Sequence, residues 1–421
     1  MDRRKFIQGT AAGAVGLMFV KPETAFGYAA NSRVRWGLLG CGHRGTSVAT
    51  SFAKNAGVEI TALADMFPNQ LEQGKKHFDT INSSLGLGPI DPKRLFQGPD
   101  AFKAIAACDQ VDAVQISTPP FFHVEHLEGI VSAKKHAYCE KPVGVDVPQT
   151  KHALEIGKKY DGKVSMAVGF QIRSATPFVE LVRRIHAGQI GQIAQITGYY
   201  NSPPSVSYEG ATKSQDEYRL RNWLHYKNLS GDILLEQNIH VIDVINWVMQ
   251  THPVSAYAKA SRKVVTFPGD TNDNYEVIFT YPGDVQFSFT STQFNPNHYF
   301  DVAERIFGSK GHAEAPYSGP LRIMGEEPWI WAGSDKTSGG EFAANGDFHD
   351  NLADSDSMKD KGFIESITSG KFHNQISAGV DTALSCIMGR KSAELGRTVT
   401  WQEIEADKEQ YKLGMDLKQF A

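Results

Sequence analysis

The chain has 421 residues, too many for one typical hydrophobic core and about right for two domains. Hydrophobic residues make up 41% and charged residues 21%, which is typical of a globular protein, and 43 basic against 47 acidic side chains leave a formal net charge of -4. No run of like charges stands out, so the composition argues against a protein that binds nucleic acid.

The first thirty residues are predicted to be an export signal and not part of the fold. Adjacent Arg3 and Arg4 precede a weakly hydrophobic run over 9–20, which is shorter than the ~20 apolar residues of a membrane span. Small residues between Ala25 and Ala29 offer cleavage sites, and the pattern resembles a twin-arginine signal peptide; an ordinary secretory signal is the alternative. We therefore expect the twin-arginine export machinery to carry the folded protein to the periplasm, with no membrane anchor after processing.

Alternating strands and helices over residues 31–172 predict an N-terminal doubly wound parallel sheet of the Rossmann type. A short apolar strand at 34–39 runs into Gly40-Cys41-Gly42-His43-Arg44-Gly45, a helix follows at 46–55, and a second strand at 58–64 ends at Asp65. A glycine pattern alone is weak evidence. Between a strand and a helix, with an acidic residue at the end of the next strand, it is specific for a dinucleotide-binding site.

Five of the six residues of this glycine loop, all but Cys41, have a predicted physical role. Gly40 permits a tight turn, Gly42 lets the backbone approach a pyrophosphate, and Gly45 lets the helix and the strand pack closely. The start of the helix, with His43 and Arg44, presents free N–H groups and a partial positive charge to the phosphates. All five residues are predicted to bind the cofactor.

Asp65 completes the predicted site and indicates which dinucleotide it takes. Its carboxylate can accept hydrogen bonds from both hydroxyls of the adenosine ribose. It is followed by Met66 and Phe67 and not by a basic residue, so a 2′-phosphate would meet a carboxylate with no nearby cation. We therefore expect NAD rather than NADP.

The alternation of strand and helix continues to the end of this domain. We expect helices at 102–107 and 122–133 and strands at 113–117, 136–139 and 164–170. Thr118-Pro119-Pro120 ends one strand at the carboxyl edge of the sheet, where doubly wound sheets hold their ligands. Glu140-Lys141-Pro142 follows the next strand.

A second domain is expected over 173–421, as a mostly antiparallel sheet covered by helices on one face. The predicted elements are a helix at 177–187, strands at 193–200, 275–281 and 285–290, a long loop at 332–357 and two helices within 363–395. Pro282-Gly283-Asp284 is a hairpin signal. The polar and aromatic segment 201–230, with Trp223 and Tyr226, suits a sugar ring and an irregular loop equally well. Helical spacing over 234–249 places Glu236 and His240 on one helix face.

Cysteine usage gives no sign of a metal site or of a disulfide framework. The four cysteines form no C-x-x-C pair and have apolar or glycine neighbours: Cys41, Cys108, Cys139 and Cys386. We expect four free thiols in or near the core.

Taken together, these residues resemble the Gfo/Idh/MocA family of glucose–fructose oxidoreductases and inositol dehydrogenases. The resemblance runs from about Val34 to about Val399 and rests on the stretches 37–45, 117–119 with His123, 135–142 and 306–311. It implies that six residues join the cofactor site: Ser117, Thr118, Pro119, His123, Glu140 and Lys141. It also implies a homo-oligomer, dimer or tetramer, built on the open face of the second sheet.

The resemblance further implies catalytic roles. Lys141 would contact the nicotinamide ribose and the substrate, and would donate to the reacting oxygen. The family carries an acid and a histidine four residues apart, which Glu236 and His240 match, although the family usually has Asp in place of Glu236. His240 can take a hydroxyl proton as hydride leaves carbon. The alternatives are that His240 is a structural histidine in the core, or that it binds a metal together with Glu236. We expect no metal. Gln171 and Arg173 match a region near the substrate cleft, where Arg173 can equally be structural.

The sequence therefore predicts hydride transfer between a tightly bound NAD(H) and a hydroxyl or carbonyl of a sugar, polyol or glycoside. An exported protein cannot draw on cytoplasmic NAD, so it should hold and recycle its cofactor in place. One alternative is an NAD-dependent glycosidase that acts by transient oxidation and elimination, whose His-Gly-Val-Gly segment is replaced here by His240-Val241-Ile242-Asp243. The other is a non-catalytic binding protein on the same fold.

Overall fold

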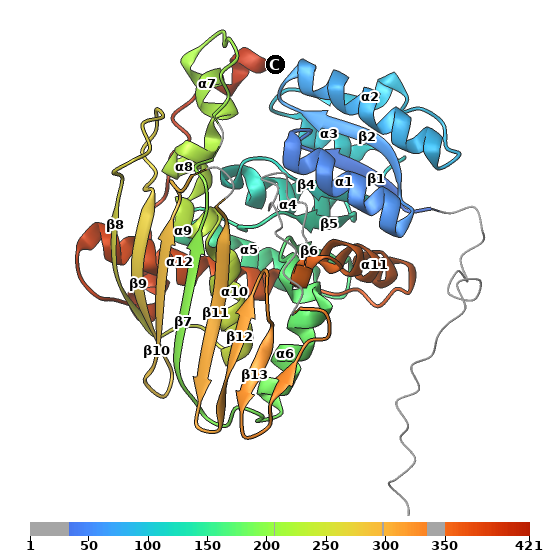
Figure 1. Cartoon of the computed structure of the whole chain (residues 1–421). Coiled ribbons are helices and arrows are strands. Elements are labelled where there is room, and N and C mark those ends of the chain that lie inside the picture. The colour runs from blue at the N-terminus through green and yellow to red at the C-terminus, as the bar shows by residue number, and fades with distance from the viewer. Residues whose placement is uncertain (1–32, 206, 297–298, 335–349) are drawn as a thin grey trace, which may run out of the picture. The chain divides into compact units, whose positions relative to one another are not determined.

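The computed structural model describes residues 33–205, 207–296, 299–334 and 350–421 (Figure 1). Within it, Val34–Ala421 form one compact unit. The predicted export signal and residues 335–349 of the predicted long loop lie outside the described residues. No helix in the described part of the chain is long and apolar enough to cross a bilayer.

The first half forms a six-stranded parallel sheet in the order β3-β2-β1-β4-β5-β6, which confirms the predicted Rossmann-type sheet. Its strands are β1 (Arg35–Leu39), β2 (Glu59–Asp65), β3 (Leu95–Gln97), β4 (Ala113–Ile116), β5 (His136–Cys139) and β6 (Met166–Val168). The helices between them are α1 (His43–Ala56), α2 (Pro68–Ser84), α3 (Ala101–Ala107), α4 (His123–Ser132) and α5 (Val147–Tyr160). All of these strands are short, and all but the edge strand β3 are fully or almost fully buried, as expected for a sheet covered on both faces.

Several boundaries differ from the sequence prediction. α1 begins at His43, three residues before the predicted start, because Gly42 is already its extended N-cap residue. β6 ends at Val168, since Gly169 and Phe170 lead into the 3₁₀ helix η3 (Gln171–Ser174). α2 and α5 were not among the predicted elements.

The second half forms a nine-stranded sheet in the order β14-β13-β12-β11-β7-β10-β9-β8-β15. Its strands are β7 (Ile193–Asn201), β8 (Ser255–Ser261), β9 (Asn274–Tyr281), β10 (Val285–Thr292), β11 (Asp301–Gly308), β12 (Gly311–Pro316), β13 (Arg322–Gly325), β14 (Trp329–Ile330) and β15 (Val399–Thr400). The β9–β10 hairpin turns at the predicted Pro282-Gly283-Asp284. Only β7 and β10 pair in parallel, so the prediction of a mostly antiparallel sheet is confirmed.

Helices cover one face of this sheet, as Figure 1 shows. The helices of this half are α6 (Thr176–His186), α7 (Gln215–Arg221), α8 (Lys227–Ser230), α9 (Ile233–Glu236), α10 (Ile239–Met249), α11 (Ser355–Thr368), α12 (Ile376–Leu395) and α13 (Trp401–Ala406). α6, α10 and α12 contact strands of the second sheet. α11 instead packs against α1, where its buried Phe363 meets Trp36 and Phe52.

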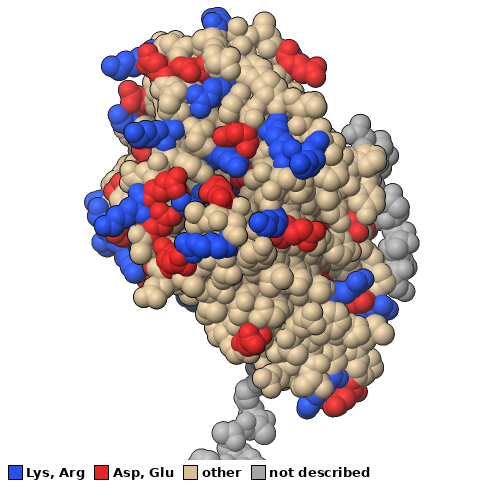
Figure 2. Space-filling model, turned by 90° about the vertical axis from the view of Figure 1, so that its left-hand side faces the viewer, with Lys and Arg blue, Asp and Glu red and all other residues tan. Residues whose placement is uncertain are grey.

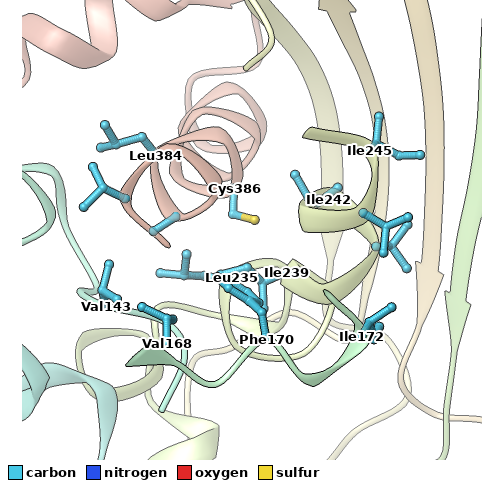
Figure 3. Close-up of a cluster of buried hydrophobic side chains, with 14 of the residues drawn as sticks. Val143, Val168, Phe170, Ile172, Leu235, Ile239, Ile242, Ile245, Leu384 and Cys386 are labelled. Atoms are coloured by element: carbon cyan, nitrogen blue, oxygen red, sulfur yellow. The ribbon is translucent and has the colours of Figure 1, made fainter. Parts of the chain in front are cut away.

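A shared apolar core joins the two sheets (Figure 3). Val143 and Val168 come from the first sheet's side, Leu235 and Ile239 from α9 and α10, and Cys386 from α12. Burial of apolar side chains is worth about 25 cal/mol per Å², so this core gives the two halves a common source of stability. All four cysteines are free thiols, as predicted.

The other face of the second sheet carries no helix in Figure 1. Strand alternation turns large apolar side chains outward there, and several are exposed: Tyr257, Ile278, Phe307, Met324 and Ile330. On the face drawn in Figure 2, charges of both signs are interspersed over the upper part, and the lower part is mainly uncharged.

The prediction of one helix over 234–249 is wrong, because the chain forms two helices there. α9 ends at Glu236, and α10 begins at Ile239. The N–H groups of Gln237 and Asn238 both donate to the carbonyl of Ile233, so the hydrogen-bond ladder is interrupted at this point. Glu236 and His240 therefore lie on different helices.

Candidate active site

The glycine loop between β1 and α1 has the geometry of a phosphate-binding turn. Gly40 has a φ of 95°, where side chains are strained, and a Cβ there would lie 2.5 Å from the carbonyl oxygen of Ser117. A Cβ on Gly45 would lie 1.9 Å from the carbonyl oxygen of Gly40, so α1 packs closely on β1 only because Gly45 lacks one. A Cβ on Gly42, by contrast, would meet nothing within 4 Å.

The open space beside Gly42 belongs to a cavity of about 400 Å³. Ligand pockets span roughly 300–1,000 Å³, so the size suits a large part of a dinucleotide. Seven of the predicted cofactor residues line this cavity: Gly40, Gly42, His43, Asp65, Ser117, Thr118 and Pro119. No side chain caps α1, and its first turn has no acidic residue, so its first N–H groups can face an anion.

Asp65 ends β2 at the edge of this cavity. Its carboxylate accepts from the N–H groups of Cys41 at 2.7 Å and Phe67 at 2.9 Å, which fixes its orientation. Burial raises the pKa of Asp65, although those two N–H groups and the charge of Arg221 act against it. Each carboxylate oxygen has a further lone pair that a ribose hydroxyl can use.

The expectation that no cation lies near Asp65 is wrong, because Arg221 comes from α7, far along the chain. Its guanidinium lies 3.8 Å from the centre of the Phe67 ring, and it lines the same cavity. It also donates to Glu217 at 2.8 Å and to Asn69 at 3.0 Å, so two of its five N–H donors are engaged in these bonds. The argument for NAD from neighbouring residues alone was therefore incomplete.

Arg44 and Glu140 form an ion pair at 3.0 Å that ties the start of α1 to the end of β5. Neither lines the cavity. A Cβ on Gly169 would lie 2.6 Å from the Glu140 carboxylate, so Gly169 leaves room for that side chain. The structure thus gives both predicted cofactor residues a supporting position behind the loop.

His123 connects two loops at the carboxyl edge of the first sheet. Its ring nitrogens lie 2.7 Å from the carbonyl oxygens of Thr118 and Pro142, and the residue is 1% exposed. Burial lowers the pKa of His123. This predicted cofactor residue therefore positions the Thr118 turn and the segment after Lys141, and its ring does not line the cavity.

Lys141 and Glu236 meet across the two halves of the chain. The ammonium of Lys141 donates to a carboxylate oxygen of Glu236 at 2.7 Å and also to its backbone carbonyl. Their side chains are 11% and 12% exposed. Lys141 precedes a cis peptide bond to Pro142. The predicted partnership of Glu236 with His240 is thus replaced by a buried pair between Glu236 and Lys141.

His240 lies near the start of α10 and is 9% exposed. Its Nδ1 is buried and has no hydrogen-bond partner among the described residues. Burial lowers its pKa well below the usual value, and the charges of Lys141 and Arg44 act in the same direction. The imidazole is therefore neutral near pH 7, which leaves it able to accept a proton.

The four residues predicted to bind substrate have different surroundings. Arg173 makes a bidentate pair with Asp243 at 2.7 and 2.9 Å, which favours the structural alternative. Gln171 is buried, and its Oε1 lacks a partner among the described residues. Trp223 lines the cofactor cavity, and Tyr226 stacks under Arg219.

Sequence reasoning missed residues that reach the cavity from distant segments. They are Tyr208, Leu220, Arg221 and Leu417. No local motif marks them, because they follow no strand of the first sheet. Their only signal in the sequence was the aromatic and polar composition of 201–230, which has no counterpart at Leu417.

The described residues fit a dinucleotide. The evidence is the open space at Gly42, the uncapped N-terminus of α1 and the oriented Asp65 at the edge of one cavity. No cluster of three or more potential metal ligands occurs among the residues described.

Comparisons with known proteins agree with this geometry. The model of the oxidoreductase family with an NAD-binding Rossmann fold matches residues 34–168, and that of the GFO/IDH/MocA C-terminal domain matches residues 178–314. Together they cover more than half of the chain.

Among curated relatives, the chain is 27% identical over 294 residues to inositol 2-dehydrogenase of Rhizobium meliloti, covering 69% of this chain and 78% of the relative. It is 24% identical over 381 residues to myo-inositol 2-dehydrogenase of Thermotoga maritima, covering 88% and 99%. A solved structure of levoglucosan dehydrogenase with NADH and levoglucosan has a TM-score of 0.67, 18% identity, and coverage of 88% and 99%. At that identity, the likeness shows the shared fold.

The contrast between Gly42 and Gly45 gives a first prediction. Alanine at Gly42 should leave the unliganded protein as stable as the wild type, because its methyl group contacts nothing. The same methyl group occupies the space of the pyrophosphate, so the dissociation constant for NADH, measured by fluorescence titration, should rise about tenfold or more.

Gly45→Ala is the matched control for this experiment. Its methyl group would overlap the Gly40 carbonyl, so it should lower the thermal midpoint even without cofactor. Wild-type NADH affinity in Gly42→Ala would contradict the predicted pyrophosphate position.

The lowered pKa of His240 gives a second prediction. The unfolded chain takes up a proton at His240 as pH falls through about 6.5, and the folded chain does not. His240 therefore makes the wild type lose stability at low pH. Between pH 7.5 and 5, the free energy of unfolding should fall by at least about 1 kcal/mol more in the wild type than in His240→Gln.

The control is His152→Gln, because the hydrogen bond that His152 donates to the Glu128 carboxylate raises the pKa of His152. The free energy of unfolding depends on pH in the opposite sense at His152: the stabilisation that His152 contributes is present below about pH 6.5 and is lost as pH rises. Denaturant titrations at both pH values measure each difference. Equal pH dependence in wild type and His240→Gln would show that folding does not lower the pKa of His240.

Proposed function

The chain belongs to the Gfo/Idh/MocA family of NAD-binding oxidoreductases, and we propose that it transfers hydride between NAD(H) and a ring hydroxyl or carbonyl of a neutral polyol or sugar. The observation that carries the proposal is the buried pair of Lys141 and Glu236, with the neutral His240 close enough for the Lys141 charge to lower its pKa. A donor, an orienting carboxylate and a proton acceptor are the groups that alcohol oxidation needs.

In the oxidation direction, each residue has a separate task. The ammonium of Lys141 donates a hydrogen bond to the reacting oxygen, while Glu236 holds that ammonium in place. His240 accepts the hydroxyl proton at its unpartnered Nδ1 as the carbonyl forms. NAD⁺, which Gly42, Asp65 and the other residues lining the cavity would hold, would supply the acceptor for the carbon-bound hydrogen and its electron pair, so the oxidation balances. Reduction runs through the same groups in reverse.

The proposed substrate class follows from the polar atoms without partners. Gln171 Oε1, Asn238 Oδ1 and His240 Nδ1 are buried acceptors, and buried acceptors normally have donors. Hydroxyl groups of a polyol can supply those donors. Relatives named inositol 2-dehydrogenase and levoglucosan dehydrogenase support a polyhydroxylated ring. These names favour a dehydrogenase over the glycosidase and the non-catalytic alternative.

Substitution of the two catalytic candidates gives a third prediction. The wild type should reduce NAD⁺ with at least one compound from a panel of myo-inositol, scyllo-inositol, levoglucosan and common hexoses. Lys141→Met and His240→Gln should each lower kcat by about a hundredfold or more, because general acid–base groups contribute 10²–10⁴-fold. NADH absorbance at saturating substrate measures the rate.

His152→Gln is the control, since His152 is half-exposed, pairs with Glu128 and lies on α5, outside the residues that line the cavity. It should retain wild-type kcat. Wild-type turnover in Lys141→Met would remove Lys141 from the mechanism. A wild type that releases aglycone from glycosides without net NAD⁺ reduction would favour the glycosidase instead.

We also propose that the protein acts in the periplasm with a retained cofactor. Arg3 and Arg4 ahead of a short apolar run support export by the twin-arginine pathway, which carries folded proteins. NAD(H) inserted before export would have no external pool to exchange with, so a second substrate must reoxidise or reduce it in place.

A fourth prediction tests export. In a bacterium with a twin-arginine system, the wild type should appear in the periplasmic fraction with NAD(H) bound in about equimolar amount, measured after denaturation by mass and absorbance. Replacing both Arg3 and Arg4 by Lys should hold the protein in the cytoplasm with its cofactor still bound. Export of that double variant at the wild-type level would contradict the twin-arginine assignment.

We further propose that the protein is a homo-oligomer. The exposed apolar side chains on the helix-free face of the second sheet, Ile278 and Phe307 among them, support association through that face. The sparse charge over the lower part of the surface in Figure 2 fits the same interpretation.

A further inference from the structure

The last fifteen residues of the chain form an extended strap, defined here as residues 407–421. Beyond α13 its regular structure is limited to the 3₁₀ helix η6 (Leu417–Phe420). Figure 1 shows the C-terminus beside α7, close to α2 of the first half. The strap therefore returns from the second sheet to the cofactor half.

Side chains of the second half hold the strap along its length. Arg390 lies 4.9 Å from the centre of the Tyr411 ring. Asn228 donates to the carbonyl oxygens of Lys412 and Leu413, and Arg219 donates to that of Gly414 at 2.9 Å. Asp216, at the start of α7, accepts from the N–H of Asp416 and from the amide of Gln419. The strap is thus a built structural element anchored to α7, α8 and α12.

The end of the strap contacts the two loops that flank the cofactor cavity. The Phe420 ring meets the Phe67 ring edge to face, with centroids 5.7 Å apart. A Cβ on Gly98 would lie 3.2 Å from the Phe420 carbonyl oxygen, so the backbones of these segments are adjacent. Leu417 lines the cavity itself.

Phe67 is held from a second direction by α7. The guanidinium of Arg221 lies over its ring, and the same guanidinium reaches Asn69 at the start of α2. Tyr208 lies on the cavity wall with Arg221 4.9 Å from its ring centre. Asp65, the predicted ribose acceptor, is two residues before Phe67, so these contacts surround the adenosine end of the cavity.

We propose that the strap and Arg221 form a closure over the adenosine end of the cofactor site and retain NAD(H) there. Leu417, Phe420 and Arg221 thereby become cofactor-site residues, although none belongs to the glycine loop or its strands. NAD(H) can leave or enter past them only when Phe420 separates from Phe67, because the strap joins the second half to both flanking loops. The proposal rests on NAD(H) binding in this cavity, and not on export or on the substrate.

The experiment measures NADH release directly. Full-length protein loaded with NADH is mixed with excess NAD⁺, and the loss of bound NADH fluorescence is followed in time. Three variants are compared with the wild type: a chain ending at Leu413, Phe420→Ala, and the control Lys418→Ala, whose side chain is exposed in the same 3₁₀ helix. Circular dichroism and the thermal midpoint without cofactor establish that each variant is folded.

The truncated chain and Phe420→Ala should release NADH about tenfold faster or more, while Lys418→Ala releases it at the wild-type rate. The rate of NADH association should also rise in the first two variants, because entry of NADH no longer requires the strap to open. Release within twofold of the wild type in folded Phe420→Ala would overturn the retention role. Faster release with an unchanged association rate would overturn the closure, because it would show that the strap contacts bound NADH without blocking its entry.

These outcomes are separable from failure of the proposed function. A wild type that binds NADH but turns over no polyol would leave the closure standing and the substrate assignment wrong. A wild type that binds no NADH would overturn both.

Discussion

The ion pair between Lys141 and Glu236 is the constraint around which the two halves are arranged. A buried ammonium without a partner carries a large desolvation cost, so the end of β5 is stable only where a carboxylate from the second half meets it. That requirement fixes α9 against the carboxyl edge of the first sheet. The apolar contacts among Val168, Leu235 and Ile239 then hold both halves in the same position.

The break between α9 and α10 is a consequence of the same constraint. A continuous helix would place Glu236 and His240 on one face, so both side chains would point into the same space. Ending α9 at Glu236 turns that carboxylate to Lys141 and leaves the Nδ1 of His240 free of it. Glu236 and Lys141 thus satisfy each other, while the buried Nδ1 of His240 has no partner among the described residues.

Local patterns in the sequence predicted the first sheet, and seven of the predicted cofactor residues line one cavity beside it. A few neighbouring residues specify each of three features: the turn at Gly40, the strand ending at Asp65 and the hairpin at Pro282-Gly283-Asp284. A single sequence is therefore enough to predict them. Arg221 beside Asp65 was missed because tertiary packing brings them together across more than 150 positions. The helix break was missed because apolar periodicity continues unchanged through Gln237 and Asn238.

The position of Ala421 restricts where an extra peptide can be attached to this chain. Because Ala421 lies beside Gly98, at the rim of the cavity, any peptide fused after it begins at that rim. Purification tags therefore belong elsewhere than at this terminus, and chains lacking only their final few residues lose part of the cavity wall while keeping both sheets.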